Sequence, residues 1–171
     1  MRAWHAPLEQ TGFTLLELLM VVGLIAILAG IVIVAINPTK QLGSTRDAKR
    51  RAEVNSILNA ISQYAIDHGG TFPCDPSGSP CVDSTWRMLG NQSTGCDEDS
   101  TCNVSGIASA CLFLRSLSGT YVTTMPGDPR YGSGNALSAN SKSLYLVQTV
   151  GDRITVQACK AEVDGISSVS R

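Results

Sequence analysis

A long apolar run near the N-terminus constrains this chain more than any other feature. From Phe13 to Ile36 there are 24 residues, and the only charge among them is Glu17. A helix of about 20 apolar residues is long enough to cross a lipid bilayer, so the run predicts one membrane-spanning helix. A carboxylate this close to a span is costly unless something compensates it, which makes Glu17 a candidate functional residue.

The residues at the start of this run resemble a known processing signal. A short polar leader ends in Gly12, Phe13 follows it, and Glu17 is the fifth residue after the leader. This arrangement resembles the N-terminal motif of type IV prepilins and type II secretion pseudopilins. The resemblance implies that a prepilin peptidase cleaves between Gly12 and Phe13 and that Phe13 is then N-methylated. It also implies that the Glu17 carboxylate meets the N-terminal amine of a neighbouring subunit as a filament grows.

Two simpler interpretations of the N-terminus fit less well. An ordinary secretory signal has an apolar core of about 7–15 residues followed by a small-residue cleavage site. This run is longer, and no such site follows it. A plain signal anchor explains the span but gives no reason for the residues from Gly12 to Glu17.

The charges flanking the span oppose export, whereas the motif and the cysteines favour it. The leader carries Arg2 as its one firm positive charge, and several basic residues follow the span: Lys40, Arg46, Lys49, Arg50 and Arg51. By the positive-inside rule alone, the C-terminal side would lie in the cytoplasm. We nevertheless expect a single-pass protein of the cytoplasmic (inner) membrane with its C-terminal part outside the cytoplasm, and then in a cell-surface filament.

Six cysteines lie beyond the span and none lies within it: Cys74, Cys81, Cys96, Cys102, Cys111 and Cys159. An even number confined to the exported part predicts disulfides formed in an oxidising compartment. Connectivity does not follow from the sequence, and we expect Cys74–Cys81, Cys96–Cys102 and Cys111–Cys159. A zinc site is the competing interpretation. There is no Cys-x-x-Cys and His68 is the one histidine outside the leader, so we expect no metal and no other cofactor.

A second helix should follow the span. Asn37-Pro38 should end or kink the first helix, and the residues from Ser44 to Asp47 predict a capping box that starts the second. Gly43 should loosen the chain between them. Apolar residues then recur at helical spacing: Ala48, Ala52, Val54, Ile57, Leu58, Ile61, Tyr64 and Ala65. His68-Gly69-Gly70 should end this helix, because glycine adopts the left-handed cap readily.

The remainder predicts a small head of loops and strands. Residues 71–106 read as loop, and we expect short structured pieces at these places: Trp86–Leu89, Ala110–Leu117 and a strand near Tyr121–Thr124. Leu144–Val150 and Ile154–Ala158 predict a β-hairpin that packs across the second helix. The turn from Met125 to Pro129 resembles one found in pseudopilins, although an ordinary turn explains it equally well. The acidic turn at residues 97–99 could hold calcium, but a solvated turn is favoured.

The expected fold class is α+β, a pilin-like lollipop with a long N-terminal helix packed on a small antiparallel sheet and stapled by disulfides. We divide the chain into a leader at 1–12 and a transmembrane or filament-core helix at 13–36. An amphipathic continuation at 37–68 and a Cys-rich head at 69–171 follow.

No catalytic arrangement of residues is evident, so we expect a structural protein and not an enzyme. The net charge of −1 gives no basic excess, and no direct nucleic-acid partner is expected. Lys49-Arg50-Arg51 is interpreted as a solvated helix face or an inter-subunit charge partner.

The expected function is that of a structural subunit of a type IV pilus-like filament. Its partners would be other pilin copies, the membrane, a prepilin peptidase, and the assembly ATPase and platform protein that the resemblance implies. Two alternatives remain open. One is a type II secretion pseudopilin that acts in protein secretion, and the other is a membrane-anchored extracytoplasmic binding module.

Overall fold

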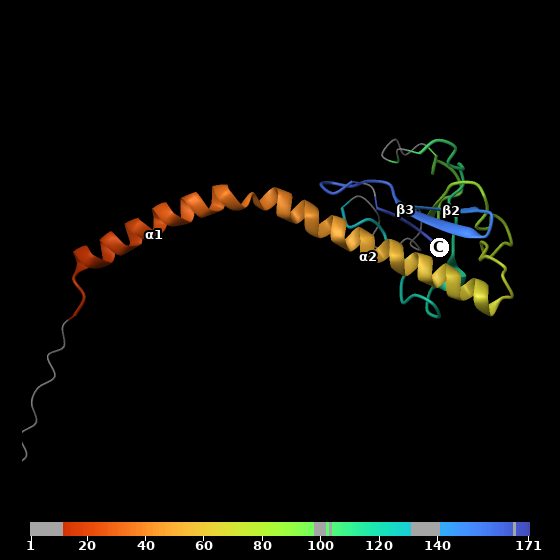
Figure 1. The fold of residues 1–171 in the computed structure, drawn as a ribbon, viewed down its shortest axis with the longest axis horizontal. Coiled ribbons are helices and arrows are strands. Elements are labelled where there is room, and N and C mark those ends of the chain that lie inside the picture. The colour runs from red at the N-terminus through yellow and green to blue at the C-terminus, as the bar shows by residue number, and fades with distance from the viewer. Residues whose placement is uncertain (1–11, 98–101, 103, 131–140, 166) are drawn as a thin grey trace, which may run out of the picture. The chain divides into compact units, whose positions relative to one another are not determined.

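A computed structural model describes residues 12–97, 102, 104–130, 141–165 and 167–171 of the chain. The chain divides into two units, residues 1–41 and 42–171. In chain order the elements are α1 (Leu15–Ile36), α2 (Pro38–Asp67), β1 (Arg87–Gly90), the 3-10 helix η1 (Arg115–Leu117), β2 (Lys142–Val150), β3 (Arg153–Ala158) and β4 (Ser168–Ser170) (Figure 1). The long apolar helix, the antiparallel sheet and the disulfides confirm the expected α+β, pilin-like class.

The boundary between α1 and α2 is set by two residues. Asn37 adopts a left-handed conformation with φ of 46° and ends α1, as expected from Asn37-Pro38. Pro38 then opens α2, a position where its missing N–H costs nothing. The Asn37 side-chain oxygen accepts hydrogen bonds from the Thr39 hydroxyl at 2.8 Å and from the Lys40 N–H at 3.3 Å. Asn37 therefore caps the end of one helix and the start of the next.

The expected capping box at Ser44 is wrong, because α2 runs without a break from Pro38 to Asp67. Gly43 lies inside this helix and does not loosen it. A Cβ added at Gly43 would lie 2.8 Å from Val163 Cγ2, so this glycine permits close packing of the C-terminal segment. The helix ends as expected: Gly69 and Gly70 have positive φ, and the Gly70 N–H donates to the Ala65 carbonyl at 2.7 Å.

The buried face of α2 differs from the predicted apolar stripe in its first half. The buried residues of this helix are Gly43, Asp47, Arg50, Val54, Ile57, Leu58, Ala60 and Ile61. Ala48 and Ala52, which were expected on this face, are exposed. The buried stripe thus continues toward the N-terminal end of α2 through a glycine and two charged residues.

The sheet is antiparallel throughout and has the order β1-β2-β3-β4. The predicted hairpin is confirmed as β2 and β3, with Tyr145 paired to Ala158 and Val150 paired to Arg153. The expected strand near Tyr121–Thr124 is wrong, because this segment makes only an isolated bridge between Ser118 and Val122. The short strand β4 was not predicted.

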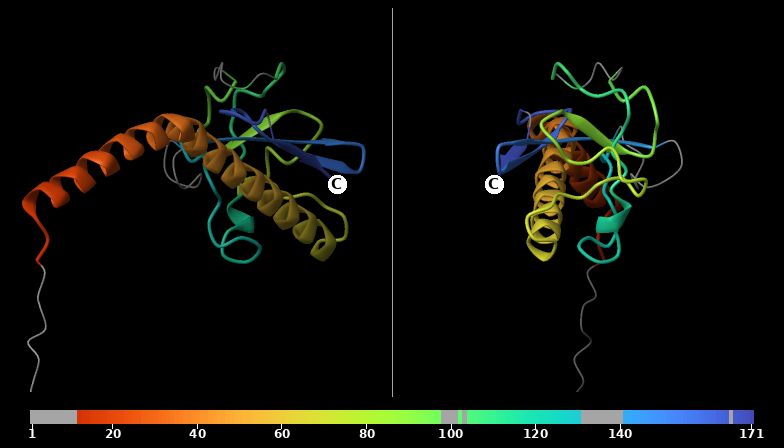
Figure 2. Two further views of the ribbon diagram at one scale, coloured as in Figure 1. Left: turned by 60° about the vertical axis from the view of Figure 1, so that its left-hand side comes forward. Right: turned by 90° about the vertical axis from the view of Figure 1, so that its right-hand side faces the viewer.

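The strand β2 is buried on both of its faces, which makes it the centre of the head. On one face, Tyr145 and Val147 pack in one core cluster with Val54, Ile57 and Ile61 of α2. On the other face, Leu144 and Leu146 pack with four cysteines and Met88. The strand β2 therefore lies between α2 and the loops that carry the Cys96–Cys111 and Cys102–Cys159 disulfides. The left view of Figure 2 shows α2 below the strands.

Candidate functional site

The segment around the expected cleavage point is accessible in this structure. Gly12 and Phe13 precede α1 in a non-helical conformation, and the Phe13 residue is 83% exposed. A Cβ added at Gly12 would meet no atom of the described residues within 4 Å. A protease could reach this peptide bond without moving any other described part of the chain.

Thr14 and Glu17 organise the first turn of α1. Thr14 is the N-cap, and its side-chain oxygen accepts a hydrogen bond from the Glu17 N–H at 3.2 Å. Glu17 is exposed in the first turn, where the positive end of the helix dipole stabilises a carboxylate. Within the part of the chain that the structure describes, Glu17 makes no ion pair. Its charge is therefore available to a group outside this chain.

The helix α1 buries none of its own residues. Its large apolar side chains are exposed by between 47% (Ile36) and 83% (Val34), and they surround the helix on all sides. By length and composition this helix can cross a membrane. A helix that is apolar on every side needs either lipid or other helices around it, and Gly23 and Gly30 offer places for close approach, since an added Cβ there meets nothing within 4 Å.

A second constellation of charged residues lies inside the head, and sequence reasoning missed it. Arg50, on α2, is 1% exposed. Its Nε and Nη2 atoms donate to the two carboxylate oxygens of Asp128 at 2.6 and 3.0 Å. Its Nη1 atom donates to Asp47 Oδ1 at 2.6 Å, and Nη2 also donates to Glu162 Oε1 at 3.1 Å. The interpretation of Arg50 as part of a solvated face is therefore wrong.

Glu162 extends this cluster toward the surface. Its carboxylate accepts hydrogen bonds from Arg46 at 2.7 and 2.6 Å and from Arg130 at 2.7 Å. Three arginines thus face three carboxylates: Arg46, Arg50 and Arg130 against Asp47, Asp128 and Glu162. The charges balance, which allows the innermost members to remain ionised in the interior.

Asp47 anchors the C-terminal segment to α2. Its carboxylate accepts hydrogen bonds from three consecutive backbone N–H groups, those of Glu162 at 3.0 Å, Val163 at 2.7 Å and Asp164 at 3.1 Å. Successive N–H groups that converge in this way form a nest for an anion. Asp47 was expected to belong to a capping box at the start of a helix. Its carboxylate instead accepts hydrogen bonds from a segment more than a hundred positions away in the chain.

The pKa shifts in this cluster follow from the same contacts. Burial opposes the charge of Arg50, but hydrogen bonds to Asp128 and Asp47 outweigh it and raise the pKa of the guanidinium. Burial also opposes the charge of Asp47, and the N–H groups of residues 162–164 overcome that effect and lower its pKa. Hydrogen bonding to Arg46 is the largest cause that lowers the pKa of Glu162, to about 2. All of these groups are ionised at neutral pH.

The turn at Met125–Pro129 acquires a structural role from this arrangement. Gly127 and Asp128 are buried, and the Asp128 N–H donates to the Ser143 carbonyl at 2.8 Å. The turn therefore carries the innermost acceptor for Arg50 and is not an ordinary solvated turn. In the sequence, Gly43, Asp47 and Arg50 precede Val54 at helical spacing, on the face that the apolar residues continue. This spacing could have revealed that Asp47 and Arg50 are buried.

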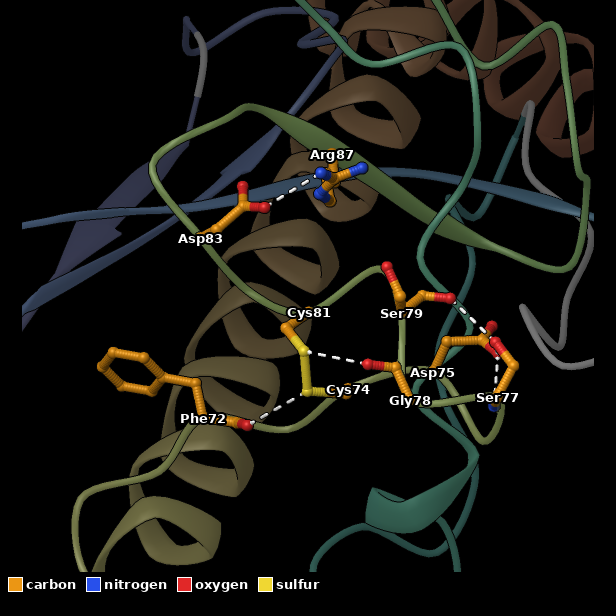
Figure 3. The surroundings of a disulfide bond; sticks show 9 residues. All are labelled: Phe72, Cys74, Asp75, Ser77, Gly78, Ser79, Cys81, Asp83 and Arg87. Atoms are coloured by element: carbon orange, nitrogen blue, oxygen red, sulfur yellow. Dashed lines mark hydrogen bonds and ion pairs between the residues drawn. A yellow bond between two sulfur atoms is a disulfide. The ribbon is translucent and has the colours of Figure 1, made fainter.

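All six cysteines form disulfides, but only one of the three expected pairs is present. Cys74 is bonded to Cys81 (Figure 3). The expected pairs Cys96–Cys102 and Cys111–Cys159 are wrong, because the structure has Cys96–Cys111 and Cys102–Cys159. The Cys96 N–H donates to the Ser109 carbonyl at 2.9 Å and the Cys111 N–H to the Gln92 carbonyl at 3.0 Å, so the segments around residues 96 and 111 lie side by side. In the acidic turn, residues 98 and 99 lie outside the described part, and calcium binding there stays untested.

The comparisons with known proteins bear on the N-terminal segment. A family model, the prokaryotic N-terminal methylation motif, matches residues 9–33. This motif is the hallmark of type IV pilins and pseudopilins. Neither the curated proteins nor the solved structures gave a match to the chain.

Proposed function

We propose that this chain, a precursor of the pilin and pseudopilin type, is a structural subunit of a type IV pilus-like filament. In this proposal a prepilin peptidase cleaves after Gly12, and Phe13 becomes the N-methylated terminus. The mature chain then leaves the cytoplasmic membrane and joins a polymer of pilin copies, driven by an assembly ATPase and its platform protein. The observation that carries the proposal is that the matched motif, residues 9–33, includes most of a helix that buries none of its own residues.

A polymer gives α1 and Glu17 partners that a single anchored chain does not have. In the membrane precursor, lipid surrounds the apolar side chains of α1. In a filament, the corresponding helices of other copies surround them. The Glu17 carboxylate can then pair with the amine of Phe13 in a neighbouring copy, which offsets the cost of removing both charges from water. A plain membrane-anchored binding module has no such use for Glu17.

The disulfides favour a filament on the cell surface over a secretion pseudopilus in the periplasm. Three disulfides link the described cysteines, and all of them lie in the head. Disulfides form in both compartments, but a small head that is exposed on a surface fibre gains more from covalent crosslinks. The Met125–Pro129 turn carries Asp128, the buried acceptor for Arg50, and this role is compatible with either kind of filament.

The test is mass spectrometry of the intact protein and of its N-terminal peptide, from native membranes and from material sheared off the cells. We expect a chain that starts at Phe13 and carries one added methyl group, present in the sheared fraction. The same processed chain confined to the membrane and periplasmic fractions would favour the pseudopilin. An uncleaved Met1 terminus, found only in membranes, would overturn the filament proposal and leave an anchored binding module.

Gly12→Val supplies the matched variant for this experiment. A Cβ added at Gly12 meets no described atom within 4 Å, so a loss of cleavage would report on recognition by the peptidase and not on misfolding. Gly23→Ala is the control, because it also adds a Cβ into open space but lies inside α1, away from the cleavage point. We expect cleavage to be lost in the first variant and kept in the second.

A further inference from the structure

A polar depression of about 450 Å³ lies on the head, between three segments of the chain. The segments are residues 75–80, 90–93 and 110–113. The Cys74–Cys81 disulfide closes the first segment into a ring, and the Cys96–Cys111 disulfide holds the third. Disulfides therefore constrain two of the three walls of the depression.

The first wall presents a carboxylate in a defined orientation. Asp75 Oδ1 accepts hydrogen bonds from the Ser77 N–H at 2.9 Å and the Ser77 hydroxyl at 2.8 Å. The Asp75 N–H donates to the Pro80 carbonyl at 2.8 Å, across the ring. Figure 3 shows Asp75, Ser77 and Ser79 together in the ring, on the other side of the disulfide from Phe72. Among the described residues, Asp75 Oδ2 has no partner and is open to a ligand.

The second and third walls add unused polar groups and an aromatic ring. The side chains of Asn91 and Ser93 are without a hydrogen-bond partner in the described part of the chain. The backbone beneath them is held, because the Asn91 N–H donates to the Ser141 carbonyl at 3.0 Å. Phe113, from the third segment, is half-buried and lines the same depression.

The chemistry of these groups favours a neutral, polar ligand. An amide, a hydroxyl and a carboxylate oxygen offer both donors and acceptors, and the Phe113 ring offers a flat apolar surface. No lysine, arginine or histidine is among the described residues that line the depression, and Asp75 would repel an anion. A volume of this size lies within the range of about 300–1,000 Å³ that is usual for ligand sites.

We propose that this depression binds a neutral carbohydrate of about disaccharide size. The hydroxyl groups of the sugar would exchange hydrogen bonds with Asp75, Asn91 and Ser93, and the apolar face of a pyranose ring would pack on Phe113. This binding site goes beyond the proposed structural role, and a filament could form whether or not the site is occupied.

Saturation-transfer NMR on the purified full-length protein tests the proposal, in a zwitterionic detergent that carries no sugar. The probes are lactose, maltose, cellobiose and N,N′-diacetylchitobiose, with a sulfated heparin disaccharide as the anionic comparison. We expect saturation transfer to at least one neutral disaccharide and none to the sulfated one. The Kd of the bound sugar is then measured by titration.

Two variants test whether the sugar binds in the depression and not elsewhere on the protein. The double variant Asn91→Ala/Ser93→Ala changes two exposed side chains, and losing their hydrogen bonds should weaken binding about fivefold or more. Phe113→Leu keeps an apolar side chain but removes the flat ring, and it should also weaken binding. The control Ser56→Ala/Gln63→Ala changes two exposed polar residues on α2 and should leave the Kd unchanged.

Three results would overturn the proposal. They are the absence of binding to every neutral disaccharide, equal binding of the sulfated one, and an unchanged Kd in Asn91→Ala/Ser93→Ala. The last result would place the sugar elsewhere on the protein. None of these results depends on whether the chain is cleaved or assembled, so the carbohydrate site and the filament proposal can fail independently.

Discussion

Arg50 and Asp128 form a two-point ion pair in the interior of the head, although they stand 78 positions apart in the chain. The guanidinium and the carboxylate meet through contacts of 2.6 and 3.0 Å, and the side chains are 1% and 0% exposed. The planar fork of arginine matches a carboxylate in this geometry in a way that lysine cannot. The pair joins α2 to the Met125–Pro129 turn, and Asp47 and Glu162 join the same cluster to the C-terminal segment.

Replacing Arg50 by methionine should destabilise the head by about 3–5 kcal/mol. The substitution keeps much of the side-chain volume but leaves the carboxylates of Asp47 and Asp128 buried without their main cation. Denaturant titration of the mature protein in mild detergent can measure the change. After leader removal, Trp86 is the one remaining tryptophan and can serve as the fluorescent probe.

Arg51→Ala is the matched control for the Arg50 substitution. The Arg51 side chain is 51% exposed and makes one contact of 3.3 Å with Asp164, so its loss should cost less than about 1 kcal/mol. Arg50→Lys should fall between the two variants, because it restores the charge without the fork. Equal stability of Arg50→Met and Arg51→Ala would contradict the structural role assigned to the cluster.

Glu162 should make the stability of the head depend on pH in the acid range. Its pKa is about 2 in the folded chain, compared with the ordinary value of 4.5. A carboxyl with a lowered folded pKa contributes stability that is complete above the unfolded pKa and is lost as the pH falls through the folded one. The free energy of unfolding should therefore fall as the pH is lowered from about 4.5 to about 2. In Glu162→Gln the free energy of unfolding should be lower at neutral pH and should depend less on pH across that range.

The experiment on Glu162→Gln needs a control variant at an exposed carboxyl that makes no ion pair. Asp152 is exposed on the turn between β2 and β3, and it makes no ion pair in the described part of the chain. Asp152→Asn should change the free energy of unfolding by no more than about 0.5 kcal/mol at neutral pH. If Glu162→Gln kept the full acid slope of the unmodified protein, the contacts with Arg46 and Arg130 would not be the source of the pH dependence.

The disulfides should contribute unequally to stability. Cys102–Cys159 closes a loop with a sequence separation of 57, whereas the separation of Cys74 and Cys81 is 7. In the chain-entropy account, removing the longer crosslink costs about 4 kcal/mol and removing the shorter one about 2 kcal/mol. Double serine variants at each pair, unfolded under the same conditions, can be compared directly. A larger loss for the short ring would count against the observed pairing or against this account.

Removing the charge of Glu17 should impair assembly but leave processing intact. Glu17→Ala lies five residues beyond Gly12 on the first turn of α1, so we expect the mature chain to be produced and to stay in the membrane. Loss of one partner of a buried ion pair costs about 3–5 kcal/mol, and the amount of sheared protein should fall by more than about tenfold. Glu17→Asp keeps the charge and should retain part of the assembly. Normal filament yield from Glu17→Ala would contradict the proposed pairing of Glu17 with the Phe13 amine of a neighbouring copy.

Local signals in the sequence predicted the elements that depend on neighbouring residues. Uninterrupted apolar composition predicted α1, and Asn37-Pro38 and Gly69-Gly70 predicted where the two helices end. The hairpin of β2 and β3 followed from two β-rich runs separated by a short turn with glycine. In each case the determining contacts lie within a few positions along the chain.

Most of the wrong predictions concern partners that are distant in sequence. Ser44–Asp47 satisfied the pattern of a capping box, but Asp47 bonds instead to the backbone at residues 162–164. Arg50 looked like one of three exposed basic residues, and its burial depends on Asp128 and Glu162. Short spacing favoured Cys96–Cys102, whereas Cys96 lies beside Cys111.

The sequence by itself determined that this chain has a processing motif, one apolar helix that needs partners outside the chain, and a cysteine-stapled head. These properties follow from composition and from contacts between near neighbours along the chain. Only the tertiary structure decided which cysteines pair and which charges lie inside. A charged side chain is stable in the interior only when its counter-charges arrive from other segments, and folding alone brings those segments together.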